Sequence, residues 1–569
     1  SRTTHTMESL EKRWQVSPLI TPEADQNLNA YPLILRQILF NRGIATTEEA
    51  KIFLAAEMPK HDMYTLSEMD AAVARVVGAI ENEEKITVYG DYDADGVTSS
   101  ALMVQALSAL KAKVNCYIPN RFDEGYGLNI PAIDKLKAEG TELVITVDCG
   151  IRALPQAEHA KKIGLDLIIT DHHTPGKELP WANALLNPKK PGDHYPEKNL
   201  AGVGMAFKLA SALIEHLKPA DFTTDHLVDL VAIGTVADMV PLIGENRALV
   251  RRGLGFLRRP HRQGILSLLG ILGVKATNVV ASNIGFGIGP RLNAAGRLAS
   301  ALDAYQLLIT TDVVEAGQLA QKLDNRNRER QKITREIQEQ IEENIDFNEA
   351  ETFLIFAADP NYNPGVVGLS ASRLVESFYR PAIVAHQGEK VTRGSGRSIP
   401  EFHITHALEQ CADLLEHYGG HAAAAGFTVK NSNLEAFIAK IKMIAREELS
   451  GQDLRPILHA DADVQLDALN FELLADLDKL QPTGYGNPDP VFLSLKVRPV
   501  STRTVGKDKS HLKMTVSQED YTFDAIAFRQ GHWAEKMPEY IDMVYAFELN
   551  EFNGQKKLQL NIKDIRASE

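Results

Sequence analysis

The sequence is poor in cysteine and contains no long apolar run. Its 569 residues include only Cys116, Cys149 and Cys411, and no Cys-x-x-Cys pair occurs. This spacing excludes a disulfide framework and an all-thiolate zinc site, and it favours a reducing cytoplasm. No apolar stretch approaches the roughly 20 residues that a membrane-spanning helix needs, so we expect no membrane segment.

Positive charge is also in short supply. The chain has 61 Lys and Arg residues against 75 Asp and Glu residues, which gives a formal net charge of −14. Net charge governs solubility and encounter rates, whereas binding depends on the local field. An acidic protein can still hold DNA through a basic groove or through bound divalent cations. Charge alone therefore neither favours nor excludes a nucleic-acid partner.

The sequence pattern predicts a multidomain α/β protein with five segments. Residues 1–75 are expected to form an N-terminal arm of helices. Residues 76–245 alternate β-prone runs with helical stretches, which is typical of a parallel sheet with helical crossovers. Residues 246–346 are predicted to be helical, and the β/α alternation returns over 347–450. Residues 451–569 alternate apolar and polar side chains, which favours a small antiparallel β-barrel, with an OB-fold as the leading candidate.

Two local signals sharpen this division. The stretch from Val313 to Ile345 has no proline and carries isoleucines at four-residue spacing, which predicts one long amphipathic connector helix. These isoleucines are Ile333, Ile337, Ile341 and Ile345. Asn553-Gly554 stands between two alternating runs, and this dipeptide predicts a tight β-hairpin.

Acidic residues and histidines follow the apolar runs of segment 76–245. The runs 86–89, 143–147, 165–169 and 227–233 lead in turn to Asp91, Asp93 and Asp95, to Asp148, to Asp171, His172 and His173, and to Asp238. Because the carboxyl ends of parallel strands lie at one sheet edge, we expect these side chains to converge. Converging carboxylates raise one another's pKa unless a cation lies between them. Asp and His donors suit Mn²⁺, and Mg²⁺ is the alternative.

Each of these motifs also has an ordinary structural explanation. Asp93-x-Asp95-Gly can mark a turn or a calcium loop, and Asp148 could cap the following helix. The histidine pair could be exposed, and Asp238 could lie in a simple turn. A calcium loop is disfavoured because Met103 stands at the twelfth position from Asp91, where glutamate is required. The joint occurrence of all four motifs favours a catalytic metal site.

The motifs together resemble a known superfamily. Asp171-His172-His173, with the aspartates before and after it, resembles the DHH phosphoesterases. The stretches Asn363 to Gly368, Gly394 to Ser398 and Gly419 to Phe427 resemble the C-terminal substrate-binding (DHHA1-like) domain of that superfamily. The form Gly-Asp-Tyr-Asp-Ala-Asp-Gly of the first motif, the run Gly289 to Arg297, the connector and the barrel narrow the resemblance to the RecJ exonucleases, over nearly the whole chain.

The resemblance implies a role for each matching residue. Two ions, Mn²⁺ or Mg²⁺, would be held by Asp93, Asp95, Asp148, His172 and Asp238. Asp148 would bridge the ions, Asp171 would orient an imidazole, and His173 would face the scissile phosphate. Many superfamily members have a histidine where this chain has Tyr89. Either Asp91 substitutes as a ligand, or one ion is held less tightly.

The resemblance also implies a phosphate pocket, in which glycines let the backbone approach the terminal 5′-phosphate and Arg397 forks onto it. The expected substrate-binding residues are Gly394, Ser395, Gly396, Arg397, Ser398, Gly420, His421, Arg291, Asn293, Arg297 and Arg121. Three alternatives stay open: a plain Gly/Ser turn with a solvated Arg397, a core position for His421, and an interdomain contact for Arg297.

The implied activity is digestion of single-stranded DNA from a 5′ end to nucleoside 5′-monophosphates, in DNA repair and recombination. Contact with single-strand-binding protein is implied as well. One alternative is a DHH phosphodiesterase for short oligonucleotides or cyclic dinucleotides, although those relatives generally lack the barrel and the connector. The other is a catalytically silent DNA-binding scaffold, which would need no metal ligands.

Overall fold

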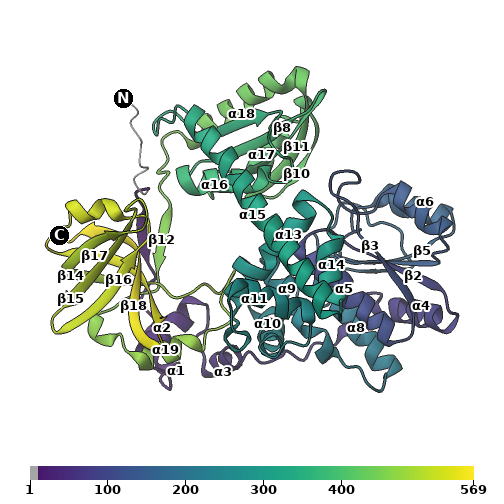
Figure 1. Ribbon diagram of the computed structural model, residues 1–569, viewed down its shortest axis with the longest axis horizontal. Helices are drawn as coiled ribbons and strands as arrows, with labels where there is room; N and C mark the ends of the chain where they lie inside the picture. Colours follow the sequence, from purple (N-terminus) through teal and green to yellow (C-terminus); the bar gives the residue numbers. More distant parts are fainter. Residues whose placement is uncertain (1–9) are drawn as a thin grey trace. The chain divides into compact units, whose positions relative to one another are not determined.

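The computed structural model describes residues 10–569 (Figure 1). It divides into two compact units. The first unit comprises residues 48–328 and 479–489, and the second comprises the chain up to Thr47 with residues 329–478 and 490–569. The five-segment division stays a prediction, and the first nine residues of segment 1–75 lie outside the described residues. Among the described residues, no helix is both long and apolar enough to cross a membrane.

The first unit contains a five-stranded parallel sheet with the order β3-β2-β4-β5-β6, which confirms the predicted sheet type. Its strands are β2 (Lys85–Tyr89), β3 (Lys113–Tyr117), β4 (Leu143–Thr146), β5 (Asp166–Thr170) and β6 (Ala184–Leu186). Every residue of β4 is buried, because helices cover both faces of the sheet. One face packs against α4 (Met69–Glu81), α5 (Ala94–Ala109) and α8 (Gly202–Leu217), and the other against α6 (Ile130–Ala138) and α7 (Leu154–Lys162).

The fourth apolar run, which leads to Asp238, lies in the helix α9 (Val228–Ala237). All residues from Val228 to Thr235 are buried. A helix that is buried on every side is apolar all round, so its sequence has no period that separates helix from strand. The neighbouring helices are α10 (Gly244–Leu257), α11 (Gln263–Leu272), α12 (Ala281–Asn283), α13 (Gly289–Leu298) and α14 (Leu302–Ile309).

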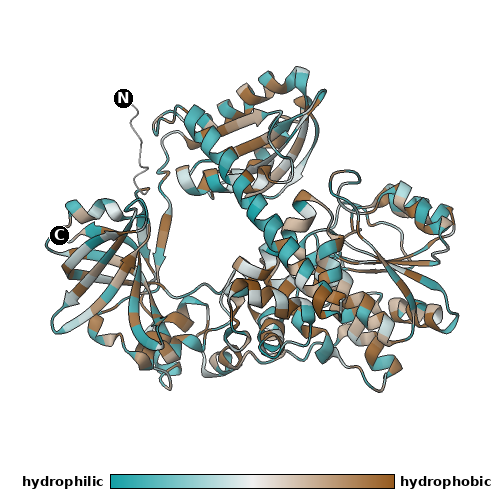
Figure 2. Ribbon diagram, viewed as in Figure 1, coloured by the Kyte–Doolittle hydropathy of each residue, from teal (hydrophilic) through white to brown (hydrophobic). Residues whose placement is uncertain are grey.

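The predicted connector is confirmed as one helix, α15 (Val313–Asn344), of 32 residues. Most of its surface is hydrophilic, and Figure 2 shows it largely in teal. Ile337 and Ile341 are buried, whereas Ile333 is half-buried, as is Ile345 just beyond the helix. The isoleucine stripe is therefore the packed face of an otherwise charged helix.

The second unit contains a five-stranded mixed sheet with the order β10-β11-β9-β8-β7. Only β7 and β8 pair in parallel in this sheet. The strands are β7 (Ile355–Asp359), β8 (Ala382–Gln387), β9 (Val391–Arg397), β10 (Leu415–Gly420) and β11 (Ala424–Lys430). The accompanying helices are α16 (Val367–Phe378), α17 (Ile404–Gln410) and α18 (Leu434–Leu449).

The C-terminal strands close into an OB-like barrel, as predicted. The ring runs β14-β15-β16-β18-β17 and closes through pairing of β14 with β17. Its strands are β14 (Phe492–Val505), β15 (His511–Gln518), β16 (Tyr521–Ala527), β17 (Ile541–Phe552) and β18 (Gln555–Ala567). The β16–β18 pair is parallel, which departs from the expected antiparallel order because β17 lies between these strands in sequence. Asn553 and Gly554 have φ values of 51° and 76°, which confirms the predicted tight turn.

The N-terminal residues of the described chain contribute both helices and a strand. The helices are α1 (Pro22–Asn27), α2 (Leu33–Asn41) and α3 (Thr47–Ala55). The strand β1 (Arg13–Val16) pairs in parallel with β12 (Ile457–Ala460), far along the chain. The remaining elements before the barrel are β13 (Ala462–Asp463) and α19 (Phe471–Asp478).

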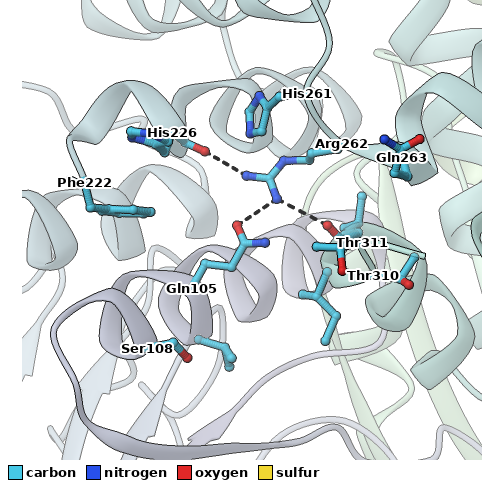
Figure 3. A pocket seen from close by; sticks show the side chains of 12 residues that line it. Gln105, Ser108, Phe222, His226, His261, Arg262, Gln263, Thr310 and Thr311 are labelled. Carbon is cyan, nitrogen blue, oxygen red and sulfur yellow. Dashed lines mark hydrogen bonds between the residues drawn. The ribbon is translucent and has the colours of Figure 1, made fainter. Parts of the chain in front are cut away.

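A buried ion pair between Arg262 and Asp229 lies in the first unit beside a cavity of about 600 Å³, and Figure 3 shows Arg262 with its hydrogen bonds to His226 and Gln105. The guanidinium of Arg262 donates to both carboxylate oxygens of Asp229, at 2.7 and 3.2 Å. It also donates to Gln105 Oε1 and to the carbonyls of Leu308 and His226. All five N–H groups of Arg262 are thereby used, so this charge stabilises the fold and is not offered to a ligand.

We expect Asp229→Ala to destabilise the first unit strongly, because it leaves the Arg262 charge buried without its counterion. The free energy of unfolding should fall by about 3–5 kcal/mol. The matched control is Asp225→Ala, which removes an exposed ion pair with Arg252 and should cost at most about 1 kcal/mol. Urea denaturation of both variants measures the difference, and equal losses would contradict the structural role assigned to the buried pair.

Candidate metal centre

The loops after β2, β4 and β5 meet at one edge of the parallel sheet, together with the end of α9. Eight predicted residues fall there into three overlapping groups, and within each group the candidate ligand atoms lie within 4.8 Å of one another. The groups are Asp91, Asp93 and Asp148; Asp95, His172 and Asp238; and Asp148, Asp171, His172 and His173. The assignment of individual residues as ligands stays a prediction.

Aspartate side chains within the loop after β2 help to fix its conformation. Asp93 caps helix α5 and accepts a hydrogen bond from Gly96 N at 2.7 Å. A Cβ at Gly96 would lie 2.5 Å from the Cβ of Asp91, so only glycine fits there. Ala94 N donates to Asn293 Oδ1 at 2.7 Å, and this contact fixes the other side of the loop.

Asp95 is held by the first turn of α8. Its two carboxylate oxygens accept hydrogen bonds from Gly202 N and Val203 N, both at 2.8 Å. Burial, and then the negative charge of Asp93, raise the pKa of Asp95 to about 7 despite these hydrogen bonds. A Cβ at Gly202 would lie 2.5 Å from Asp148 Oδ1, so the helix start approaches both carboxylates because it lacks a side chain.

Asp148 lies at the centre of the cluster in a strained conformation. Its φ of 60° is left-handed, which is uncommon for aspartate and typical of residues held in place at functional sites. Burial raises the pKa of Asp148, and the charges of Asp95 and Asp93 raise it further. Its Oδ1 lies 2.9 Å from His172 Nε2, and both atoms are buried without a hydrogen-bond partner.

The two histidines have different surroundings. His172 is buried, and burial lowers its pKa to about 3, so its ring is neutral at ordinary pH. Its Nε2 lies 3.5 Å from Asp95 Oδ2 and 3.6 Å from Asp238 Oδ2. His173 is 42% exposed, and its Nδ1 lies 2.6 Å from Asp171 Oδ1. Burial lowers the pKa of His173, but the hydrogen bond and charge of Asp171 outweigh it, so the pKa is raised overall.

Asp171 is held as a carboxylate by hydrogen bonds to the backbone and to His173. Its oxygens accept hydrogen bonds from Ile151 N at 3.0 Å and from His172 N at 2.8 Å, in addition to the His173 contact. Burial raises the pKa of Asp171, but these bonds and the two imidazoles reverse the shift, so the pKa is lowered. This arrangement orients the His173 ring through its Nδ1.

The cluster fits divalent cations of the predicted kind. Buried polar atoms are nearly always hydrogen-bonded, so the unpartnered Asp148 Oδ1 and His172 Nε2 indicate that a further group belongs between them. The neutral imidazole of His172 can act as a metal ligand. A set of carboxylate oxygens and one imidazole suits Mn²⁺ and also accommodates Mg²⁺. Tyr89, at the superfamily's histidine position, donates its hydroxyl to the Gly127 carbonyl and offers no ligand, whereas Asp91 lies in the cluster.

Two residues near the cluster were missed by the sequence analysis. The hydroxyl of Tyr126 lies 3.2 Å from His173 Nδ1 and donates to the Asp148 carbonyl at 3.2 Å. Its flanking glycines, Gly125 and Gly127, both have left-handed φ values, and the Gly-Tyr-Gly pattern is the signal that marks this loop. The positive charge of Lys189 partly offsets the raised pKa of Asp238, and no sequence pattern points to it.

The first-unit residues predicted to bind substrate mostly contact the protein itself. Arg291 forms an ion pair with Asp324 at 3.0 Å and donates to the Gly287 carbonyl. Asn293 holds the first loop, as described above, and the guanidinium of Arg121 lies 4.7 Å from the ring centre of Tyr92. Arg297 is half-buried on the same helix, α13. Within the Gly289 to Arg297 motif, Asn293 therefore supports the loop that carries Asp93 and Asp95.

Close packing explains the glycines at positions 394, 396 and 420 in the second unit. A Cβ at Gly394 would lie 2.5 Å from the Phe427 ring, and one at Gly396 would lie 2.9 Å from Ile404. Both positions face the hydrophobic core, so close packing accounts for these glycines and approach to a phosphate is not required. A Cβ at Gly420 would meet the Ala424 carbonyl at 2.3 Å, which is again a packing constraint.

The polar residues predicted to bind substrate in the second unit differ in whether their polar atoms are already bound within the protein. Arg397 lies beside Gly368 at the start of α16, and a Cβ at Gly368 would meet its Nη2 at 2.7 Å. Ser395 is on the same side, 3.6 Å from that position. The hydroxyl of Ser398 donates to the Phe402 carbonyl at 2.6 Å and is used internally. His421 is exposed, so the alternative of a core histidine is wrong.

Comparisons with known proteins agree across the chain. Three family models match: the DHH family, N-terminal domain, over residues 85–235; the DHHA1 domain over 351–447; and the RecJ OB domain over 460–564. The single-stranded-DNA-specific exonuclease RecJ of Bacillus subtilis is 40% identical over 568 residues, which cover 98% of this chain and 71% of that protein. The Escherichia coli protein of the same name is 35% identical, with 94% and 96% covered.

Solved structures give the same result. The crystal structure of RecJ in complex with Mn²⁺ from Thermus thermophilus is similar with a TM-score of 0.84 and 31% identity, over 98% of this chain and 80% of that chain. The corresponding complex with Mg²⁺ is similar with a TM-score of 0.79 and 30% identity, over 98% and 79%.

We expect divalent cations to stabilise the protein more at high pH than at low pH. The raised pKa of Asp95 favours the fold while the carboxyl is protonated, below its ordinary value of 3.8, and this contribution is lost as the pH rises through about 7. In EDTA, the Tm should therefore fall between about pH 4 and about pH 7, and Mn²⁺ should reverse the fall. Asp95→Asn should flatten the metal-free profile, and an unchanged profile in that variant would contradict this assignment.

Proposed function

This chain belongs to the RecJ family of single-stranded-DNA-specific exonucleases, and on that basis we propose that it removes nucleotides from the 5′ end of single-stranded DNA as nucleoside 5′-monophosphates. It is a metal-dependent nuclease of DNA repair and recombination, with Mn²⁺ or Mg²⁺ as cofactor. The observation that supports the catalytic proposal most directly is the pair of buried, unpartnered atoms Asp148 Oδ1 and His172 Nε2 within a cluster of carboxylates.

Within this proposal, two ions would be held by the clustered residues, with Asp148 shared between the groups. The proposed ligands are Asp91, Asp93, Asp95, Asp148, His172 and Asp238. Bound ions of this kind polarise a phosphate and lower the pKa of a water molecule. The first turn of α8 keeps Asp95 oriented for this task through two backbone hydrogen bonds.

His173 is proposed to act on the scissile phosphate. Asp171 fixes its Nδ1, so Nε2 is the atom that can donate to a phosphate oxygen. The raised pKa of His173 keeps that nitrogen protonated over a wider pH range. Tyr126 contacts the same ring and limits its rotation. The side chain is partly exposed, which is consistent with direct access to substrate.

In the second unit, Arg397 and Ser395 are proposed to bind the terminal 5′-phosphate. Both lie beside the first turn of α16, whose backbone N–H groups favour an anion. Burial lowers the pKa of Arg397, but an arginine remains charged and can fork onto two phosphate oxygens. Gly420 and His421, together with Arg121, Asn293, Arg291 and Arg297, remain proposed substrate contacts.

Two further proposals rest on the family and on composition. We propose that the C-terminal region, 451–569, contacts single-strand-binding protein, as the resemblance to the RecJ exonucleases implies. We also propose a cytoplasmic location, which the three free cysteines support because no disulfide joins any of them.

The decisive assay supplies 5′-phosphorylated single-stranded DNA, the corresponding duplex and a cyclic dinucleotide, each with Mn²⁺. We expect release of mononucleotides from the single strand alone. Asp148→Ala should abolish turnover, whereas His173→Ala should lower kcat by roughly 10²–10⁴-fold, the range typical of a proton-transferring group. Asp134→Ala on α6 removes an exposed carboxylate and serves as the control. Preferential hydrolysis of the cyclic dinucleotide would contradict the proposal.

A further inference from the structure

Three consecutive polar residues at the start of α10 are buried, although none belongs to the metal-binding groups. Glu245 and Asn246 are 0% exposed, and Arg247 is 1% exposed. Burial of polar side chains is costly unless they are hydrogen-bonded, so their partners indicate their role. Glu245 is bound by the Tyr195 hydroxyl and the Lys208 ammonium and makes a local contact within the core. The other two residues hold backbone segments that flank the metal centre.

Asn246 joins two of these segments through a single amide group. Its Nδ2 donates to the Asn199 carbonyl at 2.7 Å and to the Pro241 carbonyl at 3.2 Å. Asn199 lies three residues before the first of the two backbone N–H groups that hold Asp95. Pro241 lies three residues after Asp238. The amide therefore fixes the distance between the supports of two proposed ligands that are far apart in sequence.

Arg247 holds a different segment, residues 479–489, which we call the strap. Its guanidinium donates to the carbonyls of Leu480 at 2.8 Å, Gln481 at 3.1 Å and Pro482 at 3.2 Å. It also donates to the Phe53 carbonyl at 3.0 Å and lies over the Phe53 ring. This buried cation donates to backbone carbonyls, which ties its position to the path of the strap.

The strap in turn contacts the chain that follows Asp238. Leu242 N donates to the Tyr485 carbonyl at 2.8 Å. The carbonyl of the same peptide, that of Pro241, is the one held by Asn246, so this peptide is bound on both sides. Gly486 has a φ of 76°, and a Cβ there would lie 3.0 Å from the Cβ of Pro241. The strap therefore packs directly against the turn that positions Asp238.

We propose that Asn246 and Arg247 are positioning residues for the metal centre, acting through the Pro241–Leu242 peptide and the strap. Asn246 binds that peptide directly, and Arg247 fixes the strap that covers it. Residues that orient metal ligands typically change metal affinity or activity by about 10- to 100-fold when they are replaced. The inference rests on the proposed function, since it concerns the same ions.

The first test replaces Gly486 with alanine in the full chain. Gly486 is exposed, so the core should remain folded, while the added methyl group pushes the strap away from Pro241. Gly451→Ala is the matched control, because Gly451 also has a left-handed φ, of 84°, but has open space around its Cβ position. We expect calorimetric titration of the metal-free proteins to show Mn²⁺ binding weakened about 10-fold in Gly486→Ala and unchanged in Gly451→Ala.

The second test replaces Asn246 with leucine, which keeps the approximate shape and removes the amide. We expect a 10- to 100-fold loss of Mn²⁺ affinity, and partial rescue of exonuclease activity by excess Mn²⁺. Leu254→Ala, on the same helix, removes buried apolar volume and should lower the Tm without changing Mn²⁺ affinity.

Wild-type Mn²⁺ affinity in Gly486→Ala would overturn the inference even if Asn246→Leu did not fold. A merely structural role predicts instead that Leu254→Ala and Asn246→Leu lose Mn²⁺ affinity in proportion to their loss of Tm. If the wild-type chain released no nucleotide from single-stranded DNA, the proposed function would fail, but the binding titrations would still decide the positioning role.

Discussion

The first unit has to hold several buried carboxylates close together although they repel one another. Asp95, Asp148 and Asp238 each have a pKa raised by burial and by neighbouring negative charge. Such groups would move apart or stay protonated unless the backbone held them and a cation lay between them. The protein supplies part of the compensation itself, because the start of α8 donates two N–H groups to Asp95 and Ile151 donates one to Asp171. In the proposed function, divalent ions would supply the remainder.

The backbone, more than side-chain packing, sets the geometry of this cluster. Asp148 is held at a left-handed φ, and Gly202 and Gly96 allow main chain to approach carboxylates at distances that a Cβ would forbid. The acidic side chains are short and have few rotamers, so a fixed backbone leaves them little freedom. The geometry of the proposed ligands is therefore set by the fold, which is the preorganisation that metal catalysis requires.

The sequence predicted most of the architecture because its main signals are local. Alternating β-prone runs predicted the parallel sheet, the isoleucine spacing predicted α15, and Asn553-Gly554 predicted a hairpin. Convergence of the aspartates followed from the topology of a parallel sheet. The helix α9 had no usable period because it is buried on all sides. The close packing of Gly394 and Gly396 against Phe427 and Ile404 could not be known from one sequence.

The contacts that sequence analysis missed are those in which a side chain binds backbone far away in the chain. Asn246 and Arg247 carry no recognisable motif, and their partners are carbonyl groups, which every residue possesses. The strap illustrates the consequence, since residues 479–489 precede the barrel in sequence but pack with the first unit. Because the buried Arg247 guanidinium binds the carbonyls of consecutive residues, it fixes the course of the main chain and does not require particular side chains there. The proposed positioning role therefore depends on where the strap's backbone lies next to the turn after Asp238, where the Tyr485 carbonyl accepts from Leu242 N.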